Sequence, residues 1–219
     1  TKPSCRPGTV DRPCPYASFL TLIKNDPKAF SLALFEMSGA YLMTGDDGRP
    51  GVQTSIERLP LTAKVPSLLI VDSQIATVNA LLSEVAEILP VIWIGPRTEP
   101  QVQLEWLVGR GCEVGLAIRD GTEENFERLD AVLARDSDVP YLSQNRLFGL
   151  EFPRDLGGCG GLIWSDGDHF SVFGEAKMAQ RADIVATAVS ILHEKMRRED
   201  LAQAAVSADA LGNALAGLR

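Results

Sequence analysis

Histidine is scarce in this chain, and long apolar runs are absent. Its 219 residues include only two histidines, His169 and His193, so a zinc site built mainly from histidine is excluded. No apolar run reaches the roughly 18 residues that a membrane-spanning helix needs. Basic residues are not in excess either, because the net charge is −8. This charge argues against nucleic acid as a partner, since a nucleic-acid groove needs a basic stripe.

Cysteine is also infrequent, and its spacing excludes the common metal fingers. The four cysteines are Cys5, Cys14, Cys112 and Cys159, and no CxxC pair occurs among them. The sequence therefore predicts no metal site and no cofactor. Cys5 and Cys14 enclose the proline-rich stretch CRPGTVDRPC, which fits either a local disulfide loop or two unrelated free thiols. No signal peptide is visible, and the opening TKPSC resembles the interior of a longer chain.

Composition and length are those of a globular domain. The chain is 45% apolar and 23% charged, and 219 residues bury enough apolar surface to fold without disulfides or metals. We expect one domain over residues 1–198 and a helical tail or linker over residues 199–219, where alanine and leucine dominate.

Apolar runs alternate with amphipathic patterns along the chain. Buried strands are expected at 29–34, 91–94 and 139–142, with a weaker candidate at 112–118. Helices are expected at 18–23, 66–89 and 100–108, after an N-cap at Thr122, and as one long final helix capped by Ser171. This alternation predicts a mainly parallel sheet with helices on both faces, and chemistry in the loops at the carboxyl ends of its strands.

The segment 66–89 allows two interpretations. Its first half, SLLIVDSQ, is typical of a strand followed by a turn that carries a nucleophile. Its apolar residues, however, recur at alternating spacings of three and four, which is the pattern of one helical face. We favour a single helix, and this places Ser73 on a helix flank.

The stretch 162–180 is the most informative for chemistry. Asp166 and His169 lie three residues apart on one short loop, between an apolar strand and the helix capped by Ser171. Such a carboxylate can hold one nitrogen of the imidazole ring while the other nitrogen accepts a proton from a nucleophile. The alternative is a helix-entry loop with incidental polar residues, because an Asp-x-x-His pattern is common by chance.

The residues around this loop resemble a known family. The stretch LIWSDGDHFSVFGE (162–175) resembles the last sequence block of the SGNH (GDSL-like) hydrolase superfamily. More narrowly, it resembles the SGNH domain fused to the acyltransferase-3 membrane domain of bacterial surface-polysaccharide O-acetyltransferases. The segments AFSLALFEMSGAYL, LPVIWIGPRTEP and VPYLSQ follow the family's order, and the resemblance covers roughly residues 1–195.

The resemblance implies a three-layer α/β/α, flavodoxin-like SGNH fold with a mainly parallel sheet. It implies acyl transfer through an acyl-serine, with Asp166 as the triad acid and His169 as the base, and with Asp168 facing solvent or supporting the loop. It also implies an extracytoplasmic location, periplasmic or membrane-associated. The implied partners are an acylated or acyl-accepting polysaccharide and a fused or associated membrane acyltransferase domain.

The chain departs from the family at the nucleophile, because no Gly-Asp-Ser turn occurs in it. Ser73 is the nearest match, but too few strand–helix units separate it from His169. Ser38 stands nearest the family's missing strand-end tryptophan, with Tyr41 in the tyrosine position, and is a weaker candidate. We favour a nucleophilic serine that lies upstream of Thr1 or on another chain, or that has been lost. The sheet is then expected to lack its first strand.

The family's second cysteine before the motif is also missing, and this leaves Cys159 to pair with Cys112 or to stay free. His193 is expected to be a solvated histidine of the final helix.

Three functions follow from this sequence. The first is an SGNH-type O-acyltransferase or carbohydrate esterase domain that acts on bacterial cell-surface polysaccharide through Asp166 and His169. The second is a catalytically silent SGNH-like module that binds polysaccharide or a partner domain. The third is a small esterase that uses Ser73 as its nucleophile.

Overall fold

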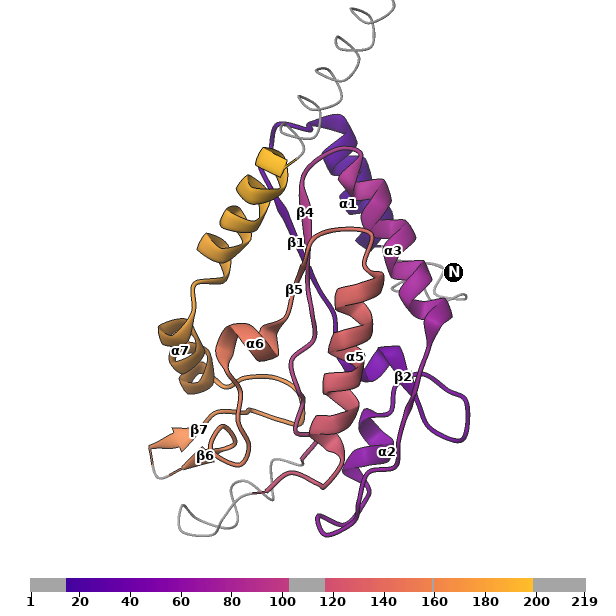
Figure 1. Cartoon of the computed structure of the whole chain (residues 1–219), viewed down its shortest axis with the longest axis vertical. Coiled ribbons are helices and arrows are strands. Elements are labelled where there is room, and N and C mark those ends of the chain that lie inside the picture. The colour runs from indigo at the N-terminus through magenta and orange to yellow at the C-terminus, as the bar shows by residue number, and fades with distance from the viewer. Residues whose placement is uncertain (1–14, 103–116, 159, 199–219) are drawn as a thin grey trace, which may run out of the picture. The chain divides into compact units, whose positions relative to one another are not determined.

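The computed structural model describes residues 15–102, 117–158 and 160–198 (Figure 1). The chain divides into two compact units, Thr1–Ala182 and Asp183–Arg219, which are described separately. In the second unit, residues 184–198 are helical. The first unit contains a parallel sheet with its covering helices, and also the loop that carries Asp166 and His169.

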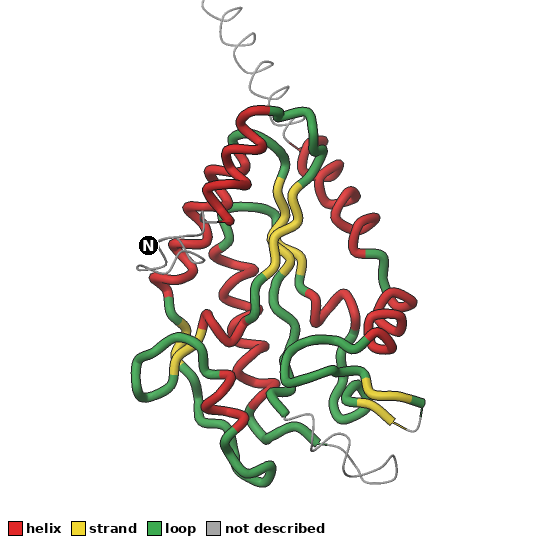
Figure 2. The backbone as a smooth tube through the Cα atoms, turned by 180° about the vertical axis from the view of Figure 1, so that it is seen from behind, coloured by secondary structure: helices red, strands yellow, loops and turns green. Residues whose placement is uncertain are grey.

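A three-stranded parallel sheet forms the centre of the first unit. Its strands are β1 (Ala33–Glu36), β4 (Val91–Ile94) and β5 (Tyr141–Leu142), in the order β1-β4-β5. Figure 2 shows these strands in yellow, side by side at the centre of the unit. All four residues of the central strand β4 are buried, as expected for a strand covered on both faces. A mixed α/β fold with a parallel sheet is confirmed, and so is the strand predicted at 91–94. Of the strand predicted at 139–142, only Tyr141–Leu142 is formed.

Helices lie on both sides of the strands (Figure 1). On one side, α3 (Asp72–Ala86) and α5 (Thr122–Asp136) contact β4 and β5, and their apolar residues join α1 (Pro15–Asn25) in one core. On the other side lie α6 (Gln144–Phe148) and α7 (Val172–Arg181). Ile92 and Leu142 are buried without belonging to the first core, and they show that the second face of the sheet is also covered.

Short elements connect these layers. After β1 come a 3₁₀ helix, η1 (Gly39–Leu42), and β2 (Met43–Thr44), which pairs antiparallel with β3 (Leu69–Ile70). Helix α2 (Gln53–Glu57) lies between β2 and β3 in the sequence. A small antiparallel hairpin of β6 (Gly157–Gly158) and β7 (Gly161–Leu162) precedes the Asp166 loop. The strand predicted before that loop therefore belongs to this hairpin and not to the parallel sheet.

Two predicted elements are displaced. The helix expected over 66–89 begins only at Asp72, because the residues before it pair with β2 and the Val71 amide donates to the Leu42 carbonyl at 2.9 Å. Tertiary pairing thus overrides the helical periodicity. The strand expected over 29–34 begins at Ala33, and its residues alternate between partly buried and exposed.

Helix ends follow the expected chemistry only in part. Ser171 caps α7, since its Oγ accepts from the Gly174 amide at 3.0 Å. The prediction of one long final helix was wrong, because α7 ends at Arg181 and a separate helix begins at residue 184. The N-cap of α5 is Gly121 rather than Thr122. Gly121 has φ 82°, and a Cβ there would lie 2.6 Å from the Val65 carbonyl oxygen, so glycine is required.

Several predictions fall outside the described residues. They concern all four cysteines, most of the segments 100–108 and 112–118, and the tail over 199–219. Within the described ranges, no helix is both long and apolar enough to cross a membrane.

A buried carboxylate fastens α7 to the segment before the hairpin. The Asp155 side chain is fully buried and accepts two bonds from the Arg181 guanidinium, at 2.5 and 2.9 Å. Arg154 and the Glu151 amide donate to the same carboxylate at 3.0 and 2.9 Å. Burial opposes ionisation of Asp155, but these hydrogen bonds together hold its pKa well below the ordinary range.

We expect Asp155→Asn to lower the free energy of unfolding by about 3 kcal/mol, because it leaves the Arg181 charge without its buried partner. Denaturant unfolding at pH 7 measures this loss. Asp136→Asn is the matched control, since Asp136 is an exposed carboxylate paired with Arg135, and it should change the free energy of unfolding far less than Asp155→Asn does.

The pH dependence of this loss tests its origin. The pKa of Asp155 is depressed in the folded state, so its stabilisation is complete above the unfolded value of about 3.9 and disappears as the pH falls below that value. The difference between wild type and Asp155→Asn should therefore be constant from about pH 5 upward and shrink below about pH 4. A difference that is unchanged at pH 3 would contradict the assignment.

Candidate active site

The loop between Trp164 and Phe170 is shaped by its own hydrogen bonds. Those two residues form an isolated antiparallel bridge, and the Ser165 amide donates to the His169 carbonyl at 2.9 Å. Inside the loop, Asp166 Oδ1 accepts from the backbone amides of Asp168 at 3.0 Å and His169 at 2.7 Å. The Asp166 carboxylate is thus turned toward the residue three positions later, as an Asp at the start of a turn commonly is.

This geometry joins the predicted acid and base. His169 Nδ1 lies 3.0 Å from Asp166 Oδ2 and 3.1 Å from its Oδ1. The His169 side chain is 70% exposed, and no described residue hydrogen-bonds to its Nε2. A carboxylate at Nδ1 fixes the proton there and leaves Nε2 as the basic nitrogen, which is the arrangement of the acid–base half of a triad.

Asp168 shares the same ring nitrogen. Its Oδ1 lies 3.0 Å from His169 Nδ1, and its side chain is only 12% exposed, compared with 51% for Asp166. Asp168 therefore does not face solvent, and supporting the loop is the role that fits. Because Nδ1 carries one proton, the two carboxylates compete for it.

Electrostatics separates the two carboxylates. Burial, and then the hydrogen bond with Asp166, raise the pKa of Asp168. Burial also opposes ionisation of Asp166, but the amides of Asp168 and His169 and the imidazole ring outweigh it and lower its pKa. The hydrogen bond to Asp166 in turn raises the pKa of His169 above its ordinary value. Asp166 is thus the ionised partner of the ring.

Arg97, which the sequence analysis did not single out, fixes the loop to the sheet. It follows β4, and its Nη2 donates to the Asp168 carbonyl at 2.6 Å while its Nη1 pairs with Glu36 at the end of β1, at 2.8 Å. The guanidinium also stacks over the ring of Phe170, with 4.3 Å from its carbon to the ring centroid. The loop consequently sits at the carboxyl ends of β1 and β4.

A buried network of hydrogen bonds, formed by the segment after β4, supports the loop between Trp164 and Phe170. The Gln101 amide donates to the Gly167 carbonyl at 2.9 Å, and its side chain donates to Glu99 at 2.7 Å. Glu99 also accepts from Ser38 Oγ at 3.1 Å and from the Gly39 amide at 2.9 Å. Burial raises the pKa of Glu99 to about 7, although the Ser38 hydroxyl acts against it. Gln101 is fully buried and has φ 51°, a strained conformation for a residue with a side chain.

The candidate serines are not joined to His169. Ser38 lies at the carboxyl end of β1, and its hydroxyl donates to Glu99. Ser73 is exposed in the first turn of α3. Among the described residues, no serine side chain hydrogen-bonds to the His169 ring, so this part of the chain holds an acid and a base without a bonded nucleophile.

The same loop offers three groups that could surround a cation. One ligand atom each from Asp166, Asp168 and His169 lies within 4.8 Å of the others. In this arrangement Nδ1 of the ring already faces both carboxylates at 3.0 Å. A metal bound through Nδ1 would replace those hydrogen bonds, and this conflicts with the use of His169 as a base.

Comparisons with known proteins do not assign the chain. No protein-family model matches it, and neither the curated proteins nor the solved structures contain a match. The interpretation of the loop therefore rests on its own geometry.

We expect the His169 ring to titrate above pH 6.5, and Asp166→Asn to lower that pKa toward 6.5, because the amide cannot stabilise the imidazolium as the carboxylate does. NMR titration of the ring protons measures both values. His193→Gln identifies the His169 signal, since the chain has only two histidines. Asp168→Asn is the matched control and should lower the pKa less. An equal or larger fall in that variant would contradict the assignment of Asp166.

Proposed function

We propose that this chain supplies the acid and base of an SGNH-type O-acyltransferase or carbohydrate esterase that acts on bacterial cell-surface polysaccharide. The observation that carries the proposal is the pairing of His169 Nδ1 with Asp166 at 3.0 Å, with Nε2 on the solvent side, at the carboxyl end of a parallel sheet. That edge of an open α/β sheet is where ligands usually bind.

The roles follow from the chemistry of the pair. Nε2 of His169 accepts the proton of a serine hydroxyl as that hydroxyl attacks an acyl carbonyl, and the imidazolium then protonates the departing alcohol. Asp166 holds Nδ1–H and stabilises the imidazolium. In the second half of the cycle, His169 deprotonates a water molecule or a sugar hydroxyl, which releases the acyl group from the serine.

Location and partners belong to the same proposal. The resemblance of residues 162–175 to polysaccharide O-acetyltransferases supports an extracytoplasmic domain that works with a fused or associated membrane acyltransferase domain. The acyl-accepting or acylated partner is then a polysaccharide, and no metal or cofactor takes part.

A catalytically silent module is the second candidate. One observation favours it, namely that no described serine side chain hydrogen-bonds to the imidazole ring of His169. In such a module the Asp166–His169 pair would form part of a surface that binds polysaccharide or a partner domain. The third possibility, a small esterase that uses Ser73, has less support, because Ser73 lies exposed on α3 and hydrogen-bonds to neither member of the pair.

Hydrolysis of 4-nitrophenyl acetate by the full-length natural protein tests the proposal. We expect His169→Gln to lower kcat/KM at least about 100-fold, because it removes the general base, and Asp166→Asn to lower it by a similar factor. His193→Gln is the matched control and should leave kcat/KM unchanged. Hydrolysis that persists in His169→Gln would overturn the catalytic role, and no hydrolysis by the wild type would favour the silent module.

Covalent labelling locates the nucleophile. A fluorophosphonate reacts with a serine that an adjacent base activates, and peptide mass spectrometry identifies the labelled residue. We expect one labelled serine other than Ser73, and loss of the label in His169→Gln. A label on Ser73 that Ser73→Ala abolishes would instead establish the small esterase.

A further inference from the structure

Gln101 has a backbone conformation that a residue with a side chain rarely adopts. Its φ of 51° lies in the left-handed region, and within the described ranges every other residue with a positive φ is a glycine. Its side chain is fully buried, and its Oε1 atom has no hydrogen-bond partner in the same part of the chain. Both features cost free energy, so the surrounding contacts must hold the residue in place.

Three hydrogen bonds fix Gln101 in this conformation. Its side-chain Nε2 donates to Glu99 at 2.7 Å, and its backbone carbonyl accepts from the Arg119 guanidinium. Its backbone amide donates to the Gly167 carbonyl at 2.9 Å. Gly167 directly follows Asp166, so the strained residue directs its amide at the turn that carries the candidate acid.

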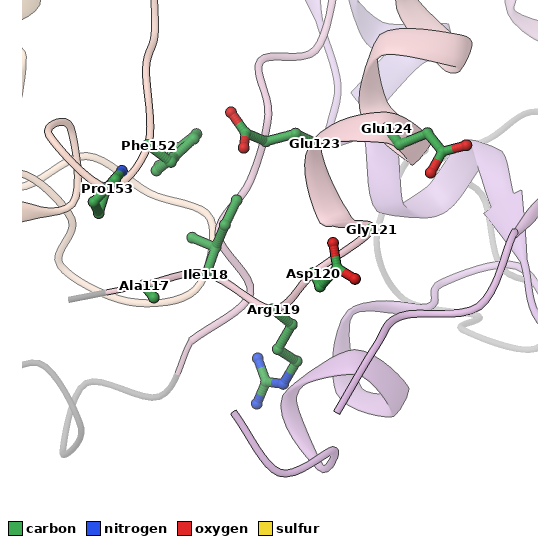
Figure 3. Close-up of a pocket in the computed structure, with 9 residues that line it drawn as sticks. All are labelled: Ala117, Ile118, Arg119, Asp120, Gly121, Glu123, Glu124, Phe152 and Pro153. Atoms are coloured by element: carbon green, nitrogen blue, oxygen red, sulfur yellow. The ribbon is translucent and has the colours of Figure 1, made fainter. Parts of the chain in front are cut away.

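The Arg119 guanidinium is itself held by backbone carbonyls. It donates to the carbonyls of Glu57 and Leu59, at 2.8 Å each, and the residue is buried. Arg119 lines a surface hollow together with Glu123, but Figure 3 shows its guanidinium pointing away from that acid. The group that binds the Gln101 carbonyl is therefore fixed by the end of α2 and the chain after it.

The Glu99 carboxyl is surrounded by hydrogen-bond donors. Besides Gln101, it accepts from the Ser38 hydroxyl at 3.1 Å and from the Gly39 amide at 2.9 Å. An ionised carboxylate only accepts hydrogen bonds, so it satisfies all three donors. A protonated carboxyl must place its own hydrogen among them, and its bonds lose the strength that charge gives. Glu99 therefore holds Gln101 most firmly while it is ionised.

The surroundings of Glu99 place its titration near neutral pH. Burial has the largest effect and raises the pKa of Glu99 to about 7. The Ser38 hydroxyl and the Gly39 amide, which face Glu99 from the end of β1, act against burial. The charge of Arg97, on the same segment, also acts against it, whereas Asp168 on the facing loop adds to it.

We propose that Gln101 is a positioning residue of the acid–base pair, and that the ionised Glu99 carboxylate holds it in its strained conformation. When Glu99 takes up a proton, Gln101 relaxes and the Gly167 carbonyl loses its donor. The contact between Asp166 and His169 then loosens. The effect on catalysis rests on the proposed function, whereas the effect on alignment is independent of it.

NMR titration of the full-length protein tests the role of Glu99 without any activity. The backbone amide signal of Gln101 should titrate with a midpoint near pH 7 in the wild type. This titration should vanish in Glu99→Gln, whose side chain stays neutral, and should persist in His169→Gln. Glu124→Gln, on an exposed carboxylate of α5, is the matched control and should leave the midpoint unchanged. The role of Glu99 is overturned if the signal does not titrate, still titrates in Glu99→Gln, or loses its titration with His169.

Gln101→Gly separates positioning from a purely structural role. Glycine adopts a φ of 51° without strain, so the variant should fold, but it lacks the side chain that Glu99 holds. The pKa of the His169 ring should fall toward 6.5, because Asp166 holds the imidazolium less firmly. Glu99→Gln, which keeps Gln101 itself, should lower the same pKa. A wild-type pKa of His169 in both variants would overturn the proposal.

The pH profile of ester hydrolysis provides the catalytic test. Glu99 and His169 must both lose a proton, so log(kcat/KM) for 4-nitrophenyl acetate should approach a slope of about 2 below about pH 6. In Glu99→Gln the slope should be about 1, and kcat/KM at pH 8 should be about tenfold lower. A wild-type slope of about 1 would overturn the coupling of Glu99 to catalysis.

Failure of this proposal and failure of the proposed function are distinguishable. A wild-type protein that shows the Gln101 titration but does not hydrolyse the ester would keep the positioning role and remove the catalytic role. Hydrolysis that depends on His169, without the Gln101 titration, would do the reverse.

Discussion

The arrangement of the site depends on the contacts that the Arg97 guanidinium makes with β1 and with the Asp166–His169 loop. It joins the end of β1, through Glu36, to the carbonyl of Asp168, and it packs on the ring of Phe170. A planar group with donors on several edges can make these contacts together, which a lysine ammonium cannot. Without it, the loop that carries the acid–base pair would lose its direct link from β4 to the backbone of Asp168.

The loop itself combines local and distant support. Asp166 orders the turn through backbone amides, and this leaves its outer oxygen for the imidazole. Gln101 and Arg97 then hold neighbouring carbonyls of the same loop from the segment after β4. Preorganised groups of this kind cost little reorganisation when charge develops, so the pair is suited to stabilise an imidazolium.

The sequence predicted those features that depend on local patterns. The run VIWI predicted the buried strand β4, Ser171 predicted its helix cap, and the spacing of Asp166 and His169 predicted their contact. The pairing of β3 with β2, which shortens the helix at Asp72, depends on contacts distant in sequence, and no periodicity reveals those. The sequence did not indicate the roles of Arg97 and Glu99 for the same reason, since only the fold brings these residues close to the Asp166–His169 loop.

If the protein acts as proposed, the exposure of His169 has a consequence for the fate of an acyl group. A ring that is 70% exposed lies within reach of bulk water, so an acyl-serine beside it would be open to hydrolysis. Transfer to a sugar would then depend on how often an acceptor occupies the site and displaces water from Nε2. The balance between transferase and esterase would be a kinetic competition, which the concentration and residence time of the acceptor decide.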